Sequence, residues 1–134
     1  MSVIVTDTGF ASDDWQHPIL ALEDARTGVA IDLASSSDPL ELAKYLPDVP
    51  MIRVDFPSFA DGRGFTIARQ LRLIGFTGRL RARGHLIADQ FTMARRAGFD
   101  EVEISDEMAK RQPESHWLFR ADWQAHDYQT RLRG

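Results

Sequence analysis

The chain contains no cysteine among its 134 residues. This absence excludes a disulfide, a thiolate nucleophile, a CxxC redox pair and a cysteine-ligated iron–sulfur cluster on this chain. No apolar run approaches the roughly 20 residues that a membrane-spanning helix needs. The first residues have neither the basic region nor the long apolar run of a signal peptide. We therefore expect a cytoplasmic protein.

Recognised nucleotide and catalytic motifs are also missing. The sequence has no GxxxxGK[ST], no GxSxG and no HExxH, and "GRGFTI" at residues 62–67 lacks the third glycine of a dinucleotide fingerprint. A pI near 5.5 and the lack of any DNA- or RNA-binding motif argue against nucleic acid. We expect no cofactor and no nucleic-acid partner.

The net charge of −4 hides an uneven distribution. Residues 62–98 hold eight arginines and one acid, Asp89, so this segment carries +7 and the rest of the chain −11. Two interpretations are open. The two parts neutralise each other across the fold, or the arginines form an exposed surface for an anion or an acidic partner, since guanidinium groups bind oxyanions in fixed forks.

Four short strand-like runs alternate with helical patterns. We expect strands at 28–33, 51–56, 78–83 and 101–105, and helices at 62–74 and 85–97. Gly75 and Gly98 are well placed to end the two helices, each followed by a phenylalanine. The repeated order of strand and helix predicts an α/β fold with a parallel sheet.

A further helix start is expected at Asp38. Asp38 would be the N-cap, Pro39 would occupy the first helical position, and Glu41 would complete a pair resembling a capping box. Pro47 and Pro50 bound the end of this segment.

Apolar and charged side chains alternate along the strands. In 51–56, for example, Ile52 and Val54 alternate with Arg53 and Asp55. One face of the sheet is therefore apolar and the other charged, unlike strands that are buried on both faces. With right-handed crossovers and all helices on the apolar face, the strands must lie in sequential order. This predicts a partial (βα) barrel-like arc; a flavodoxin-like open sheet, its charged face covered by the terminal segments, is the alternative.

The two ends of the chain give weaker patterns. Residues 114–132 form an amphipathic pattern that predicts a C-terminal helix. The poorly defined segment 1–27 is expected to add an edge strand, at 2–6 or at 18–22. We expect one α/β domain over residues 1–134.

The loop "DFPSFADGRG", residues 55–64, is the strongest candidate site. Parallel sheets bind ligands at the carboxyl ends of their strands, where this loop begins. Asp61 is placed to cap a helix beginning at Gly62, and Arg63 would lie near the positive end of that helix, which suits an anion. Gly62 and Gly64 would permit close backbone approach. The alternative is that Asp61 is only a cap and Arg63 only its ion-pair partner.

Four residues are candidates for acid–base chemistry: Asp55, Asp61, His85 and Asp89. His85 and Asp89 are spaced i, i+4, so on one helical face they could share a proton, bind a metal or form an ion pair. Two ligands are too few for a metal site, and no other histidine has matching helical spacing, so we expect none. The candidates for anion or partner binding are Arg63, Gly62, Gly64, Arg81 and Arg83.

The runs "VDFPSFADGRGFTIARQLR" and "GRLRARGHLIADQFTMARRAGFDEVEI" resemble a bacterial domain family of unknown function. Its members are typically encoded beside assimilatory sulfite reductase and are often labelled as oxidoreductases of sulfite reduction. The resemblance covers about residues 28–130 and is dense at 53–104. This chain departs from the expected pattern at His85, where we expect an acid, and at Ala97, where some members have cysteine.

The resemblance implies an accessory protein of assimilatory sulfite reduction and sulfur metabolism. It would bind sulfite reductase, another sulfur-assimilation protein or a small anion through loop 55–64. The alternative is an enzyme with an anionic substrate at the strand ends, using Asp55, Asp61 or His85 as acid or base and Arg63 to hold the substrate. A third hypothesis is a subunit-interface module, such as a homodimer.

Overall fold

The computed structural model of the chain describes residues 2–123. Seven strands form one mixed sheet in the order β2-β1-β7-β6-β5-β4-β3. They are β1 Ser2–Thr6, β2 Gly9–Ser12, β3 Ile19–Ala21, β4 Ala30–Leu33, β5 Met51–Phe56, β6 Arg79–Gly84 and β7 Glu101–Ser105. Strands β3 to β7 are parallel, whereas β1 is antiparallel to both β7 and β2.

Short helices connect and flank these strands. The α-helices are α1 Arg63–Leu73, α2 Phe91–Ala97, α3 Asp106–Arg111 and α4 Glu114–Phe119. The 3-10 helices are η1 Leu22–Asp24, η2 Pro39–Leu42, η3 Leu46–Asp48 and η4 Ala88–Gln90. None of the helices between residues 2 and 123 is long and apolar enough to cross a membrane.

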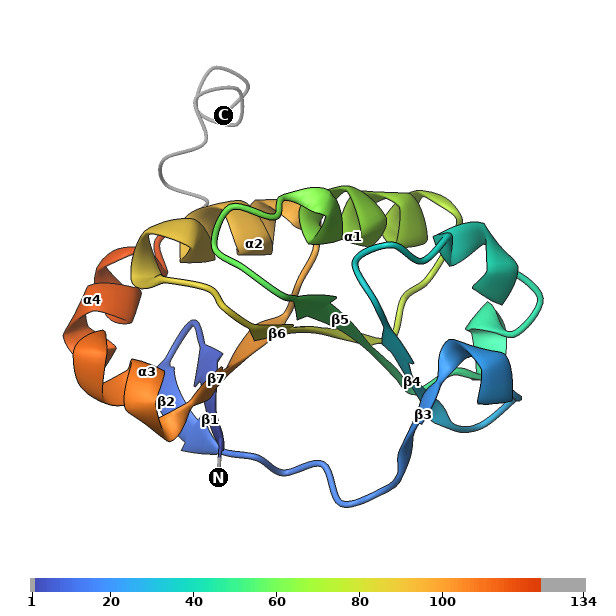
Figure 1. Cartoon of the computed structure of the whole chain (residues 1–134), viewed down its shortest axis with the longest axis horizontal. Coiled ribbons are helices and arrows are strands. Elements are labelled where there is room, and N and C mark those ends of the chain that lie inside the picture. Colours follow the sequence, from blue (N-terminus) through green and yellow to red (C-terminus); the bar gives the residue numbers. More distant parts are fainter. Residues whose placement is uncertain (1, 124–134) are drawn as a thin grey trace.

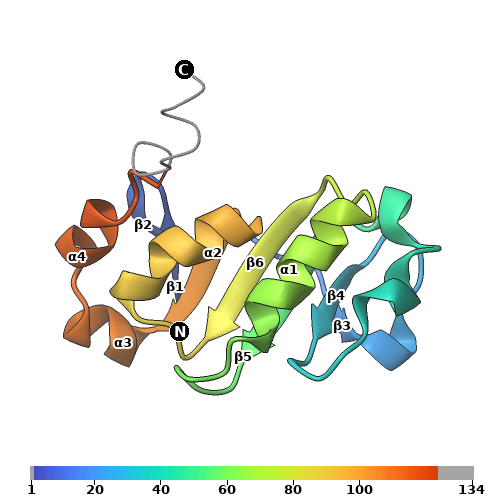
Figure 2. The same ribbon diagram turned by 90° about the horizontal axis from the view of Figure 1, so that it is seen from above.

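The sheet curves into an arc with α1 and α2 over its convex face (Figures 1 and 2). The α/β class is confirmed, and the parallel strands follow one another in sequential order, as the alternating pattern predicts. The sheet stays open and does not close into a barrel. Residues 13–18, which we call the strap, join β2 to β3 and pass beneath the concave face (Figure 1).

The apolar side chains of the strands are buried beneath the helices. Ile52, Val54 and Leu80 are fully buried, and helix α1 adds Ala68 and Leu71 to the same core. Burial of a side chain of this size contributes about 1.5–3 kcal/mol to stability. The period-2 pattern therefore separates an apolar convex face from a charged concave one.

Both expected glycine ends of helices are present. Gly75 and Gly98 have φ values of +105° and +118°, which favour glycine. The amide of Phe76 donates to the carbonyl of Leu71, and the amide of Phe99 donates to a carbonyl five residues earlier in the same way. These bonds satisfy carbonyls that the end of a helix leaves free.

Asp38 caps a helix, but that helix is short. Its carboxylate accepts a hydrogen bond from the amide of Leu40 at 3.0 Å, as an N-cap does. The following turn is the 3-10 helix η2 rather than an α-helix. Pro47 lies within the next 3-10 helix, and a residue before proline is disfavoured in the α conformation, so a continuous helix ends before it.

Two expected helix boundaries are wrong. The helix expected at 85–97 is η4 followed by α2, because Gly84 has φ +116° and Ile87 is extended. The helix expected at 114–132 ends at Phe119; its predicted continuation over 124–132 lies outside the described residues. Both N-terminal strand candidates form strands, and the first, β1, lies inside the sheet rather than at its edge.

Candidate functional site

The concave face carries a network of ion pairs between adjacent strands. The strand register places Asp32, Arg53, Arg81 and Glu101 in one row and Asp55, Arg83 and Glu103 in the next. Arg53 binds Asp32 in a two-pronged contact of 2.6 and 2.7 Å and reaches Glu103 at 3.1 Å. The Asp32 contact, together with Glu103, raises the pKa of Arg53, so its charge is firmly fixed.

Arg81 is the centre of this network and has no exposed surface. Its Nε lies 2.5 Å from Glu101 and its Nη1 lies 2.9 Å from Glu103. Asp13 of the strap approaches the same Nη1 at 3.1 Å. Asp14, also of the strap, lies 3.7 Å from Nη2. A buried guanidinium is stable only when carboxylates compensate for its lost hydration, and here four of them do. Arg81 is therefore enclosed and does not present its charge to solvent.

The strap is bound to the sheet by charge. Asp14 binds Arg79 at 2.5 and 3.0 Å, and the Arg79 guanidinium lies 5.9 Å from the centre of the Trp15 ring. The hydrogen bond from Arg79 holds the pKa of Asp14 below its usual value. Arg79 in turn is shared with Glu101 at 2.8 Å.

At least six of the eight arginines of residues 62–98 pair with an acid that lies outside that segment. The pairs are Arg63–Asp61, Arg72–Asp100, Arg79–Asp14, Arg81–Glu101, Arg83–Glu103 and Arg95–Asp7. Neutralisation across the fold therefore accounts for most of this positive charge, rather than an open guanidinium surface.

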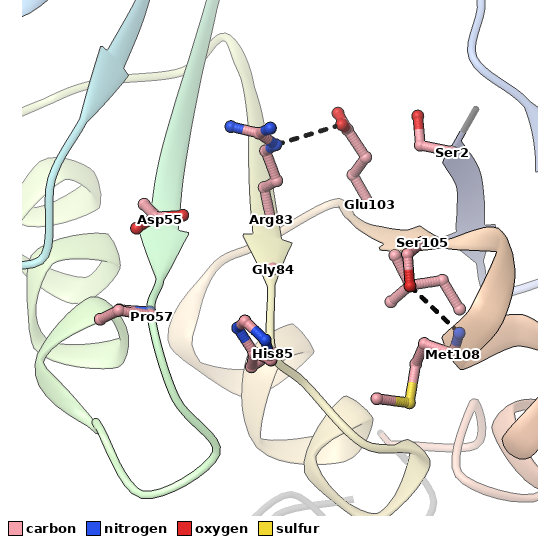
Figure 3. A pocket seen from close by; sticks show the side chains of 10 residues that line it. Ser2, Asp55, Pro57, Arg83, Gly84, His85, Glu103, Ser105 and Met108 are labelled. Carbon is pink, nitrogen blue, oxygen red and sulfur yellow. Dashed lines mark hydrogen bonds and ion pairs between the residues drawn. The ribbon is translucent and has the colours of Figure 1, made fainter.

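The carboxyl ends of β5, β6 and β7 open into a hollow of about 700 Å³, which we call the mouth (Figure 3). It is lined by Ser2, Asp55, Pro57, Arg83, Gly84, His85, Glu103, Ile104, Ser105 and Met108. A second hollow of about 280 Å³ shares Asp55 and Arg83 with it and extends toward β4. The location is the one expected for a ligand site in a parallel α/β sheet.

Arg83 and Asp55 are the least committed charges in the mouth. The Arg83 side chain is 51% exposed, and its one described ion pair is a contact of 3.4 Å with Glu103. Within the described part of the chain, the Asp55 carboxylate makes no ion pair or side-chain hydrogen bond, although Arg83 is its register partner on β6. Their charged groups remain free to meet a ligand.

His85 lies at the rim of the mouth, directly after β6. Its amide donates to the carbonyl of Phe56, and its ring meets Phe59 edge-on at 5.7 Å. Gly84 before it cannot carry a side chain, because an added Cβ would lie 2.5 Å from the same Phe56 carbonyl. The close approach of the ends of β5 and β6 therefore fixes the position of His85 at the rim of the mouth.

Asp61 and Arg63 form a separate cluster at the start of α1. Asp61 accepts from the Arg63 amide at 3.1 Å and pairs with its guanidinium at 3.0 and 2.7 Å. The Arg63 hydrogen bonds hold the pKa of Asp61 well below its usual range. Arg63 also donates to the hydroxyl of Ser35, after β4. The helix begins at Arg63, one residue later than expected, with Gly62 as N-cap. Neither charged residue lines the mouth.

The two loop glycines differ in what surrounds them. An added Cβ on Gly64 would lie 2.4 Å from the ring of Phe56, whereas one on Gly62 would meet no atom within 4 Å. Gly64 is therefore required for packing of α1 on β5, which is a structural role.

His85 and Asp89 are not partners on one helical face, because the helical segment begins only at Ala88. Asp89 instead pairs with Arg120 at 3.0 Å and lines another hollow of about 450 Å³ beside α4. Among residues 2–123, no three His, Cys, Asp or Glu side chains gather in a way that could hold a metal ion.

Sequence reasoning missed several residues of the concave face. The alternating charge of the strands places Arg53 and Glu103 on this face, and this signal could have selected them. Asp13 and Asp14 lie in a segment without strand or helix periodicity, so nothing local connects them to Arg81.

Comparison with known proteins gives one family. A model for bacterial proteins of unknown function, DUF934, matches residues 30–133. The chain belongs to this family. The family expected from the sequence is thus confirmed. The DUF934 match begins at β4, so it includes Arg83 and Asp55 but not the strap. No curated protein and no solved structure matches the chain.

Proposed function

We propose that this protein binds a small oxyanion at the mouth and acts as a cytoplasmic accessory protein of assimilatory sulfite reduction. The observation that supports it best is the half-exposed guanidinium of Arg83 at the carboxyl ends of parallel strands. Arginine presents paired N–H donors that match an oxyanion. The connection with sulfur metabolism comes from the family resemblance of about residues 28–130, which is dense at 53–104.

The other arginine candidates are less available for an anion. Arg63 is 61% exposed, but Asp61 and Ser35 already accept hydrogen bonds from its Nε and Nη2 atoms, and Asp61 balances its charge. Arg81 is enclosed by carboxylates. Loop 55–64 still takes part, because its first residues, Asp55 and Pro57, line the mouth.

Substitution of Arg83 tests this proposal. We expect Arg83→Met to weaken binding of sodium sulfite or sulfate by about tenfold to a hundredfold, since a hydrogen bond to a charged group contributes about 1.5–3 kcal/mol. Isothermal titration or NMR titration measures the affinity. The matched control is Arg69→Met, which removes an exposed arginine from α1. Equal binding by the two variants, or no binding by the wild-type protein, would refute the site.

Sulfite reductase is the protein partner that we propose. A tagged protein in sulfate-grown cells should retain the reductase or another sulfur-assimilation protein in a pull-down. Recovery of none of these proteins contradicts the partner. Light scattering of the purified protein tests the third hypothesis, a homodimer, and a strict monomer excludes it.

An enzyme with an anionic substrate is the second candidate function. The uncommitted carboxylate of Asp55, beside Arg83 and opening into the mouth, favours it, because a general acid or base must reach the substrate directly. Asp55→Asn should then keep the fold but fail to restore growth on sulfate to a deletion strain. Full restoration of growth would argue against acid–base catalysis by Asp55.

A further inference from the structure

The charges that line the mouth are largely cancelled before any ligand arrives. Glu103 is neutralised by Arg53 and Arg81, at 3.1 and 2.9 Å. Asp32, in the adjoining hollow, is occupied by the two-pronged contact of Arg53. In the mouth itself, the charges left for a ligand are therefore those of Arg83 and Asp55, which have opposite signs.

The side chains of Asp55 and Arg83 lie on adjacent strands but form no ion pair with each other. Asp55 and Arg83 are register partners on adjacent parallel strands, a spacing at which opposite charges ordinarily meet. Arg83 instead contacts Glu103 on its other side. Figure 3 shows the Asp55 carboxylate and the Arg83 side chain at the same opening, with no interaction drawn between them.

A simple anion is complementary to Arg83 but not to Asp55. An oxyanion on Arg83 would lie close to the Asp55 carboxylate, and that like-charge repulsion would oppose binding. A ligand that also carries an ammonium group would place it on Asp55 and convert the repulsion into a second ion pair. Glu23, at the edge of the adjoining hollow, adds another negative charge that favours such a group.

The size of the site agrees with a ligand larger than a bare oxyanion. The mouth measures about 700 Å³, and Asp55 and Arg83 also line the adjoining hollow of about 280 Å³. Hollows of roughly 300–1,000 Å³ hold small organic molecules. The polar side chains of Ser2 and Ser105 in the mouth suit a hydrophilic molecule of that size.

From these observations we infer that the mouth binds an amino-acid-like zwitterion, with its acidic group on Arg83 and its ammonium group on Asp55. This inference rests on the proposed oxyanion site and names the class of ligand that would occupy it. Arg83 supplies the affinity that all acidic ligands share, whereas Asp55 selects the ligands that carry an amine.

Three matched probes separate these contributions: taurine carries a sulfonate and an ammonium group, ethanesulfonate only the sulfonate, and ethylamine only the ammonium group. By NMR titration of the full chain, we expect taurine to bind at least about tenfold more tightly than ethanesulfonate, a difference of 1.4 kcal/mol. Asp55→Asn should abolish this preference without weakening ethanesulfonate binding. Arg83→Met should weaken both sulfonates, and Asp48→Asn, at an exposed acid of η3, should change neither affinity.

The possible failures are distinguishable. If ethanesulfonate binds through Arg83 and taurine binds no better, the oxyanion site stands and the zwitterion inference is wrong. If neither sulfonate binds the wild-type protein, the proposed function and the inference both fail. If Asp55→Asn retains the taurine preference, the ammonium group binds elsewhere and the inference is again wrong.

Discussion

The two glycines at the start of α1, Gly62 and Gly64, differ in whether a Cβ atom could be accommodated. Gly64 touches the ring of Phe56 so closely that a Cβ would lie 2.4 Å from it, while Gly62 faces open space. The sequence "GRG" alone cannot distinguish these two glycines, because the difference arises from a side chain eight positions earlier. The expectation of backbone approach to a ligand stays untested, and at Gly64 the neighbouring ring supplies a sufficient reason for glycine.

Alanine substitution at these two positions gives a matched stability test. Gly64→Ala should lower the free energy of unfolding by about 1–3 kcal/mol, because the new methyl group overpacks the core against Phe56. Gly62→Ala should change it by less than about 1 kcal/mol, since it loses only a modest preference for glycine at the N-cap. Urea unfolding of both variants measures the difference. Equal stability of the two would contradict the close packing of α1 on β5.

The residue scale also explains an error in the predicted site. The i, i+4 spacing of His85 and Asp89 indicates a shared face only if both residues are helical. Gly84, with φ +116°, ends β6 in a conformation that delays the helix, so His85 stays at the mouth while Asp89 turns toward Arg120. Local spacing could not reveal this, because the conformation of Gly84 depends on the contact with β5.

At the scale of elements, strands β4 to β7 are held together by charge on one face and by apolar packing on the other. The strand pattern predicts this division, the parallel direction and the sequential order, because each depends on short-range periodicity. It does not predict which charges pair. Glu103 contacts Arg81 and Arg83 on the adjacent strand β6 and Arg53 on β5, one strand further away, and only the register brings them together.

Removal of the negative charge of Glu103 should strongly lower the stability of the protein. Glu103→Gln is expected to destabilise the protein by about 3–5 kcal/mol, because it leaves the buried guanidinium of Arg81 undercompensated. Glu107→Gln is the control, since its pair with Arg111 is exposed and contributes about 0.5 kcal/mol or less. Chemical denaturation monitored by circular dichroism compares them. A loss at position 103 no greater than at position 107 would show that the network adds little stability.

At the scale of the whole molecule, the strap spans the arc of the sheet. Its acidic residues are distant in sequence from the arginines that they bind. Asp14 and Arg79 are separated by 65 positions, so no sequence window contains both. This distance is why the sequence predicts the uneven charge of the two segments but not the geometry of their neutralisation.

Acid should weaken the strap. The pKa of Asp14 is lowered in the folded state by Arg79, with Arg81 nearby, so its contribution to stability is present above about pH 4, the unfolded value, and is lost as pH falls below it. The contact is largely exposed, and we expect at most about 1 kcal/mol. Thermal unfolding from pH 3 to pH 7 should show this acid-dependent loss of stability in the wild-type protein and in Asp48→Asn. Asp14→Asn should lack it. Identical pH profiles of all three would contradict the contact.

The strap also has a consequence for the other members of the family. The matched range starts at residue 30, yet Asp13 and Asp14, which cover the dehydrated guanidinium of Arg81, precede it. In a relative with a different segment in place of the strap, an arginine at position 81 would need other carboxylates or water at the concave face to compensate its charge. Otherwise, the arginine itself would have to be replaced. Variation ahead of β4 and variation at position 81 should therefore occur together.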